Sequence, residues 1–576
     1  MLVPIDRREI PAIESSCRSE TPQVILERSY SFGRGEPVHV CRGESLNVWV
    51  KVHPQYASQA RVRFFSTVED ELDDTPHYDD CKYGGDGLFI SFFVPARTGV
   101  FVFRASYSLD GGTSWTLDEA PYTWLIVEPH AFNDIRMYTM IPTVSGHIGK
   151  WKAQLDDIRR LGCNAVHLLP VTFMDESESP YSAHDLFSID PSYLDPDDPR
   201  DGLAQWEDFV ERAKSLEIRL CIDLVLNHVG LKSRIARQRP EWIVPDAGRA
   251  DGVKRAGCWA GPDWHTWEDV LLLNYGNTDS EARDSLWAYM AEYAMFWANY
   301  AAHTVGMVRF DNLHSSSPEF IGALTRNLRR QYPDLTLLAE FFSDEDTLVR
   351  RSNEWDLDLL LATPWDYKFV PELRAYLKSI HRLSDQIRFM VPVSSHDSGS
   401  PVQDFWSTEA TYPRYATAAL LSFGATGLSQ GVECGVEQKV QFVGRNRRVE
   451  MKQSEMLVSF ITRVNEIQRN YQAFHLTQNC FFVDEGHSAV IAAVRRDPLR
   501  PHECFLVAAN FDSGAGQGLE VDLAPFLSGA GEITTEELIT RAVPSVLSGT
   551  RLSVELRPCQ VKVLRCRCPR KHRIFG

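Results

Sequence analysis

Residues 285–302 read SLWAYMAEYAMFWANYAA, and residues 306–311 read GMVRFD after a short turn. The first stretch spaces its apolar residues as an amphipathic helix does, and the second is a short apolar run typical of a buried strand. Helical texture returns in SPEFIGALTRNLRRQ at 317–331. A helix, a strand and a helix in such close succession predict a parallel sheet whose strands are joined by helices.

The same alternation extends over residues 131–470, which we predict to be a closed (β/α)8 barrel because eight strand candidates alternate with helix-like segments. Residues 229–277, after the third candidate, hold Gly, Pro and several Trp and are too long for an ordinary loop, so we expect an inserted subdomain there. The strand candidates are 134–141, 164–170, 219–226, 306–311, 335–341, 357–361, 387–395 and 426–431.

Strand-like texture without long helices flanks the barrel on both sides. In residues 1–130, runs such as LNVWVKV and GVFVFRASYS are separated by turn signals, which predicts an N-terminal antiparallel β-sandwich. In residues 471–576, runs such as SAVIAAVRR and QVKVLRC predict a C-terminal antiparallel β domain. We therefore expect three domains, with the barrel between two β modules.

Charge and hydropathy exclude several classes of partner. The 576 residues hold 60 Lys and Arg against 78 Asp and Glu, a net charge of −18, which argues against nucleic acid and anionic membranes and suits a neutral ligand. No apolar run is long enough to span a bilayer. MLVPIDRREIPAIESS at the start lacks the apolar run of a secretory signal, and the twelve cysteines are dispersed, so we expect a cytoplasmic protein with free thiols. The oligomeric state is left open.

Carboxylates end four of the predicted barrel strands. The residues are Asp223, Asp311, Glu340 and Asp397, each at the end of an apolar run. One such acid alone is usually a helix cap or a turn former. Barrel enzymes place their chemistry at the C-terminal ends of the strands, so four acids together predict one site on a shared rim. A buried structural ion network is the alternative.

Arg309 and Asp311 are two residues apart on one strand, so their side chains share a face. We expect Arg309 to keep Asp311 ionised by lowering its pKa, which suits a nucleophile in glycosyl transfer. Glu340 lies between Ala339 and Phe341, a setting that would raise its pKa towards the range of a general acid. The two would then act on opposite sides of a glycosidic bond.

Asp397 and two histidines complete the predicted site. His228 follows the third strand and His396 precedes Asp397 at the end of the seventh. We expect all three to bind sugar hydroxyls and to hold them more strongly as the ring flattens towards an oxocarbenium ion.

Four short motifs appear in order at these strand ends: DLVLNH at 223–228, MVRFDNLH at 307–314, AEFF at 339–342 and SSHD at 394–397. With them the chain resembles the α-amylase superfamily, glycoside hydrolase family 13. The resemblance implies Asp311 as nucleophile, Glu340 as acid/base and Asp397 as third carboxylate. It also implies Arg309, His228 and His396 as substrate contacts and Asp223 as a supporting residue.

Within that family the chain most resembles 4-α-glucanotransferases of the debranching-enzyme type. The likeness lies in IRMYTMIP at 135–142, SPYSAHDLFSIDP at 179–191 and DNLHSSSP at 311–318. It implies that Tyr181 contacts the cleaved sugar, with Asp185 nearby. Maltosyltransferases that use maltose-1-phosphate share a similar motif after the nucleophile.

Two features of the predicted insertion remain open. Asn227 is a calcium ligand in many members of the family that the chain resembles, so calcium is possible although no cofactor is required by the proposed chemistry. Trp259, Trp264 and Trp267 stand among polar residues and either stack on sugar rings or pack the subdomain.

The function that we predict is retaining cleavage of α-1,4-glucosidic bonds through a glycosyl-Asp intermediate, with transfer to a sugar acceptor. An α-amylase-type hydrolase is the first alternative, because the acceptor depends on loops rather than motifs. A maltosyltransferase with a sugar-phosphate donor would need a basic cluster, for which Lys232, Arg234, Lys254 and Arg255 are candidates or merely a solvated face. A non-catalytic carbohydrate-binding barrel is the last alternative.

Overall fold

The computed structural model describes the chain in several ranges, which are 23–30, 33–67, 77–95, 99–120, 122–128, 134–260, 263–384, 386–447, 449, 451–476, 479–484, 486–497, 500–527 and 532–568. The chain divides into two compact units. One comprises Met1–His130, Thr325–Pro333 and Asp344–Leu357, and the other comprises Ala131–Leu324, Asp334–Ser343 and Asp358–Gly576. The predicted boundary near residue 470 remains a prediction.

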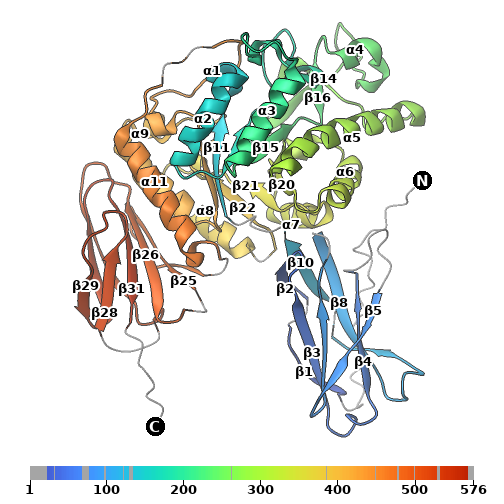
Figure 1. Cartoon of the computed structure of the whole chain (residues 1–576), viewed down its shortest axis with the longest axis vertical. Coiled ribbons are helices and arrows are strands. Elements are labelled where there is room, and N and C mark those ends of the chain that lie inside the picture. Colours follow the sequence, from blue (N-terminus) through green and yellow to red (C-terminus); the bar gives the residue numbers. More distant parts are fainter. Residues whose placement is uncertain are drawn as a thin grey trace. The chain divides into compact units, whose positions relative to one another are not determined.

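Parallel strands close into the predicted barrel, and Figure 1 shows β11 and β15 on the inside with α2 and α3 outside. Each predicted strand candidate overlaps one barrel strand, so the predicted fold class is confirmed. In spatial order the strands are β11 (Ile135–Met140), β12 (Ala165–Leu168), β15 (Arg219–Leu224), β19 (Met307–Phe310), β20 (Thr336–Ala339), β21 (Leu359–Leu361), β22 (Phe389–Pro392) and β23 (Ala425–Ser429).

Helices connect these strands. The one predicted at 285–302 begins earlier, at Ser280, because the Asp279 carboxylate accepts the backbone N–H of Glu281 at 3.0 Å and caps the first turn. The helices are α1 (Pro142–Ser145), α2 (Ile148–Arg160), α3 (Gly202–Ser215), α4 (Arg234–Gln238), α5 (Ser280–His303), α6 (Pro318–Gln331), α7 (Glu345–Glu354), α8 (Val370–Leu383), α9 (Pro401–Phe405), α10 (Thr411–Leu420) and α11 (Glu455–Asn470).

Apolar side chains fill the inside of the barrel, among them Met137 of β11 and Met390 of β22. On β23 this lining is interrupted by Gly427. A Cβ atom at Gly427 would lie 2.7 Å from the Met137 carbonyl oxygen and 2.9 Å from Met390 Cε. The neighbouring strand and Met390 therefore come too close at this position for a side chain.

The expected insertion after the third barrel strand is present as a small antiparallel sheet of order β16-β18-β17. Its strands are β16 (His228–Gly230), β17 (Arg255–Ala260) and β18 (Asp263–Leu272). A hairpin of β13 (Thr172–Met174) and β14 (Ala183–Ile189) follows the second barrel strand and carries Tyr181 in its connecting loop.

The N-terminal strands form two sheets around one apolar core, as expected of a β-sandwich. In the described part of this region the pairings are antiparallel except that β2 and β10 pair in parallel. The sheets are β1 (Ile25–Arg28), β3 (Leu46–Val52), β7 (Leu88–Phe93) and β6 (Lys82–Gly85); and β2 (Gly33–Cys41), β10 (Thr123–Glu128), β8 (Gly99–Ser108), β4 (Arg61–Ser66) and β5 (His77–Asp80), with β9 (Thr116–Leu117) beside β8.

The C-terminal strands pair in antiparallel fashion, as predicted, and enclose their own apolar core. Cysteines that the structure describes are free thiols. Within the described residues, no helix combines the length and the apolar character needed to cross a bilayer. The C-terminal sheets are β24 (Cys480–Phe482), β25 (Val490–Arg496), β26 (Glu503–Asn510), β31 (Val561–Arg567), β28 (Glu532–Glu537) and β29 (Ser545–Ser548); and β27 (Gln517–Asp522) with β30 (Arg551–Leu556).

Candidate active site

One guanidinium, that of Arg309 on β19, contacts carboxylates from three neighbouring barrel strands. Nη1 donates to the two oxygens of Asp223 on β15 at 3.0 and 2.8 Å and to Asp311 at 2.8 Å. Nη2 lies 2.7 Å from Glu340 Oε2. The strand register builds this cluster, because Asp223 pairs with Arg309 across β15 and β19. Three of the predicted acids therefore meet at one buried cation.

Sharing the guanidinium changes the acidity of the carboxylates. Burial raises the pKa of Asp311 well above 3.8, and Glu340 and Asp223 raise it further, so that Arg309 does not compensate. Burial also acts to raise the pKa of Asp223, but Arg309 and His167 outweigh it and the pKa is lowered. The expectation of a lowered pKa at Asp311 is wrong, because burial and the charges of Glu340 and Asp223 outweigh the effect of Arg309.

Two backbone amides of the segment that follows β19 hold Glu340 in place. Its Oε2 accepts the backbone N–H of Asn312 at 2.9 Å, and its carbonyl accepts the N–H of Leu313, also at 2.9 Å. Asn312 adopts a left-handed backbone with φ 43°, which turns these amides towards β20. The residue after Asp311 thus fixes the carboxylate of Glu340.

A second cluster joins the ends of the second, third and seventh strands. The Tyr181 hydroxyl donates to Asp223 Oδ2 at 3.0 Å and lies 2.7 Å from His396 Nε2. His396 Nε2 is also 2.9 Å from Asp397 Oδ2. Desolvation acts to raise the pKa of Asp397, but His396 and more distant cations outweigh it and the net pKa is lowered. Asp397 is therefore an ionised carboxylate connected to Asp223 through two side chains.

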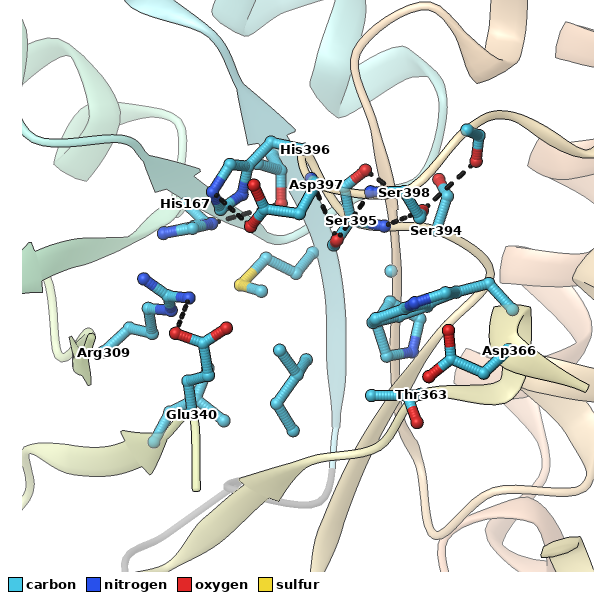
Figure 2. A pocket seen from close by; sticks show the side chains of 18 of the residues that line it. His167, Arg309, Glu340, Thr363, Asp366, Ser394, Ser395, His396, Asp397 and Ser398 are labelled. Carbon is cyan, nitrogen blue, oxygen red and sulfur yellow. Dashed lines mark hydrogen bonds and ion pairs between the residues drawn. The ribbon is translucent and has the colours of Figure 1, made fainter. Parts of the chain in front are cut away.

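A cavity of about 390 Å³ opens at the C-terminal ends of the strands. Figure 2 shows Glu340, beside Arg309, on the opposite side of this cavity from Thr363 and Asp366, with His396 and Asp397 along a third side. Of the predicted residues, Arg309, Glu340, His396 and Asp397 line the cavity, whereas Asp311, Asp223, Tyr181 and His228 do not. The Asp311 side chain pairs with Arg309 and is 9% exposed.

His167 at the end of β12 is a cavity residue that the sequence reasoning missed. Its Nε2 lies 3.1 Å from Asp223 Oδ2, and its Nδ1 lies 3.2 Å from Thr139 Oγ1 on β11. Burial lowers the pKa of His167 although Asp223 acts to raise it. The signal was present, since a histidine inside the apolar run NAVHLLP at the end of a barrel strand is unusual.

The loop after β21 supplies a further wall of the cavity that no motif indicated. Thr363, Trp365, Asp366 and Lys368 line it. The preceding run, LDLLLATP, has no charged residue directly at the strand end, so the search for acids at strand ends did not detect this loop.

His228 occupies a different place from the one expected. It is buried, its Nε2 lies 3.1 Å from the Tyr181 carbonyl, and its Nδ1 lies 2.7 Å from Asn227 Oδ1. Burial lowers its pKa to about 4, so the ring is neutral at pH 7. Both ring nitrogens contact protein groups, so His228 supports Tyr181, and its predicted contact with sugar remains a prediction.

The surroundings of Asn227 do not point to calcium. Its amide contacts His228, and in the described ranges no group of three or more His, Cys, Asp and Glu side chains could hold a metal ion. We therefore derive no step through calcium. Calcium binding itself stays a prediction.

The tryptophans of the insertion differ in exposure. Trp267 packs edge-on against His228 with ring centroids 5.4 Å apart, whereas Trp264 is 43% exposed. The side chain of Trp259 lies outside the described ones. Asp185 pairs with Arg234 at 2.8 Å, and its expected place near Tyr181 stays a prediction.

Comparison with known proteins gives a consistent picture. Residues 128–244 match the family described as glycogen debranching enzyme, glucanotransferase domain. The chain is 23% identical over 332 residues to an alpha-1,4-glucan:maltose-1-phosphate maltosyltransferase of Mycobacterium tuberculosis, covering 54% of this chain and 43% of the relative. The corresponding protein of Salinibacter ruber is 23% identical over 308 residues, covering 50% and 43%. The chain thus spans less than half the length of these relatives.

Solved structures resemble the fold. A maltogenic alpha-amylase from Thermotoga neapolitana has a TM-score of 0.61 at 16% identity, covering 76% of this chain and 100% of the other. A debranching enzyme from Nostoc punctiforme has a TM-score of 0.57 at 15% identity, covering 76% and 99%.

Proposed function

We propose that this chain, which belongs to the α-amylase superfamily, is a retaining enzyme that cleaves α-1,4-glucosidic bonds and transfers the glycosyl group to a sugar acceptor. The observation that carries the proposal is the contact of Asp311 and Glu340 with one guanidinium, at 2.8 and 2.7 Å. Retaining glycosidases need a nucleophile and an acid/base only about 5 Å apart, and a shared Arg309 keeps the two carboxyls close.

In the first step, the Asp311 carboxylate forms a bond to the anomeric carbon while the bond from that carbon to the leaving oxygen breaks. Glu340 gives its proton to that oxygen, and a covalent glycosyl ester results. Because burial raises the pKa of Asp311, this carboxyl has to be ionised before it can act as the nucleophile. For this step the proton must be on Glu340, and substrate must reach the recessed Asp311.

In the second step, Glu340 takes a proton from the acceptor hydroxyl, whose oxygen bonds to the anomeric carbon as the ester to Asp311 breaks. Asp397 and His396 face the same cavity and would bind the hydroxyls of the reacting sugar. If the acceptor is a sugar the enzyme is a 4-α-glucanotransferase, and if it is water the enzyme is an α-amylase-type hydrolase. The match to a glucanotransferase domain favours transfer.

A maltosyltransferase with a sugar-phosphate donor is the second candidate, because curated relatives carry that name. The basic residues considered for phosphate offer it little support, since three of them pair with carboxylates. These pairs are Lys232 with Glu176, Arg234 with Asp185 and Arg255 with Asp251.

The deciding experiment is a product profile on maltoheptaose. Longer oligosaccharides are expected; shorter products alone, with new reducing ends, would establish hydrolysis instead. A parallel incubation of glycogen with maltose-1-phosphate, monitored for released orthophosphate, tests the second candidate. Absence of turnover with every donor would favour a non-catalytic binding barrel.

A further inference from the structure

Two large aromatic side chains are exposed, one in the loop that lines the cavity and one in a segment that is paired with this loop. Trp406, directly after α9, is 88% exposed, and Phe369, directly before α8, is 70% exposed. Exposed apolar groups of this size next to a cavity mark binding surfaces more often than isolated surface residues do. We call this pair the outer platform.

Buried and charged groups fasten the two segments of the outer platform to each other. Arg414 donates to the carbonyls of Tyr367 and Lys368 at 2.7 and 2.6 Å, and its guanidinium lies 4.2 Å from the ring centre of Phe405. Lys368 also forms an ion pair with Asp404. Phe369 follows Lys368 and Trp406 follows Phe405, so the two segments that carry the outer platform are joined to each other.

The same surface continues into the cavity. Trp365, Asp366 and Lys368 line the cavity and precede Phe369 in the same loop. This loop is fixed from below, because Tyr376 stacks on Tyr367 with ring centroids 4.3 Å apart and its hydroxyl accepts the Thr363 N–H at 2.8 Å. The loop that lines the cavity and carries Phe369 is therefore preformed.

The backbone of Trp406 is an independent observation. Its φ of 54° and ψ of 27° are left-handed, a conformation that glycine adopts freely and a bulky residue rarely adopts at a helix end. The N–H of Trp406 donates to the Val402 carbonyl at 2.8 Å, which holds the turn. Such outliers cluster at ligand-binding sites, and here the turn projects an indole into solvent.

We propose that the outer platform binds glucose units of a neutral α-glucan chain whose cleaved bond lies in the cavity. The inference rests on the proposed function and adds the substrate length. A pyranose presents a C–H face that packs on an aromatic ring, and its hydroxyls remain solvated. A neutral chain fits because Lys368 is already paired with Asp404 and Asp366 adds negative charge, which disfavours phosphorylated sugars.

The test measures binding of maltose and maltoheptaose by titration calorimetry to the full chain carrying Asp311→Asn, which prevents consumption of the ligand. Trp406→Gly in that background removes the indole at a position whose backbone suits glycine. We expect the Kd of maltoheptaose to rise about five- to tenfold, the Kd of maltose to stay unchanged, and Trp406→Phe to restore most of the affinity.

Phe481→Ala, which removes an exposed aromatic from β24, is the matched control and should leave both affinities unchanged. Thermal unfolding of each variant checks that the fold is intact. If maltoheptaose binds Trp406→Gly as tightly as the parent, the outer platform is refuted and the proposed function stands. If the parent binds neither sugar, the proposed function fails and the inference fails with it.

Discussion

The ring of Tyr181 lies face to face with His396, with centroids 5.5 Å apart and planes 13° from parallel. The Tyr181 hydroxyl at the same time reaches Asp223 at 3.0 Å. One side chain therefore connects the Arg309 cluster with the pair of His396 and Asp397. The stack and the hydroxyl bridge can be separated by substitution.

Tyr181→Phe keeps the stacked ring and removes the bridge. We expect kcat/KM on maltoheptaose to fall about tenfold and the free energy of unfolding to fall by about 1 kcal/mol, the usual size of one lost hydrogen bond. Tyr181→Ala removes the ring as well and should cost clearly more activity. Equal kcat/KM for the wild type and Tyr181→Phe would show that the bridge has no role in turnover.

Asp311→Asn should abolish turnover and yet stabilise the protein at neutral pH. The folded pKa of Asp311 is raised above 3.8, so stability present below the unfolded pKa is lost as pH rises through the folded pKa. An uncharged Asn avoids this loss, and the gain should be on the order of 1 kcal/mol at pH 7 and disappear near pH 3. Thermal unfolding at both pH values measures it.

Asp185→Asn is the control for that experiment. Asp185 is also buried, and it pairs with Arg234 at 2.8 Å. Removing its charge should lower the melting temperature at pH 7. A lower melting temperature for Asp311→Asn as well would contradict the shared-guanidinium argument.

Glu340→Gln should separate the two catalytic roles. Without a proton donor, cleavage of maltoheptaose should slow by about 10²- to 10⁴-fold. A donor whose leaving group needs no proton, α-maltosyl fluoride, should recover most of the first step in Glu340→Gln but none of it in Asp311→Asn. Fluoride release in a single turnover is the measurement. Equal recovery in both variants would contradict the assignment of Glu340 as proton donor and Asp311 as nucleophile.

His167→Gln should identify His167 as a positioning residue. It orients Asp223, and through it Arg309, and we expect kcat to fall about 10- to 100-fold with KM changed less than about threefold. Thr139→Val, which removes only the hydroxyl next to His167 Nδ1, should show a smaller effect in the same direction. A purely structural role would instead lower the melting temperature and leave kcat per folded molecule unchanged.

The barrel was predictable because its strands are short apolar runs between helices. Each of the strands β11 to β23 that form the barrel overlaps a predicted run, and the predicted acids lie at or shortly after the ends of four of them. Arg309 and Asp311 could be placed on one face because side chains alternate along a strand. These inferences need only local pattern.

Other parts of the site depend on distances between segments remote in sequence. The raised pKa of Asp311 follows first from its burial and then from the nearby charges of Glu340 and Asp223, which no local pattern reveals. His228 could not be placed because its neighbours, Tyr181 and Trp267, come from a hairpin and an insertion. The wall around Asp366 was missed because loop conformation, rather than a motif, turns it to the cavity.

Gly427 lines the cavity and also lies where the barrel closes. It pairs with Met137 across β23 and β11, the seam where the last strand meets the first. A methyl group there would press on the Met137 carbonyl at 2.7 Å before it touched any sugar. A larger residue at position 427, introduced to make the cavity shallower and favour shorter chains, would consequently separate β11 from β23. Changes of substrate length therefore have to be made at the rim of the cavity.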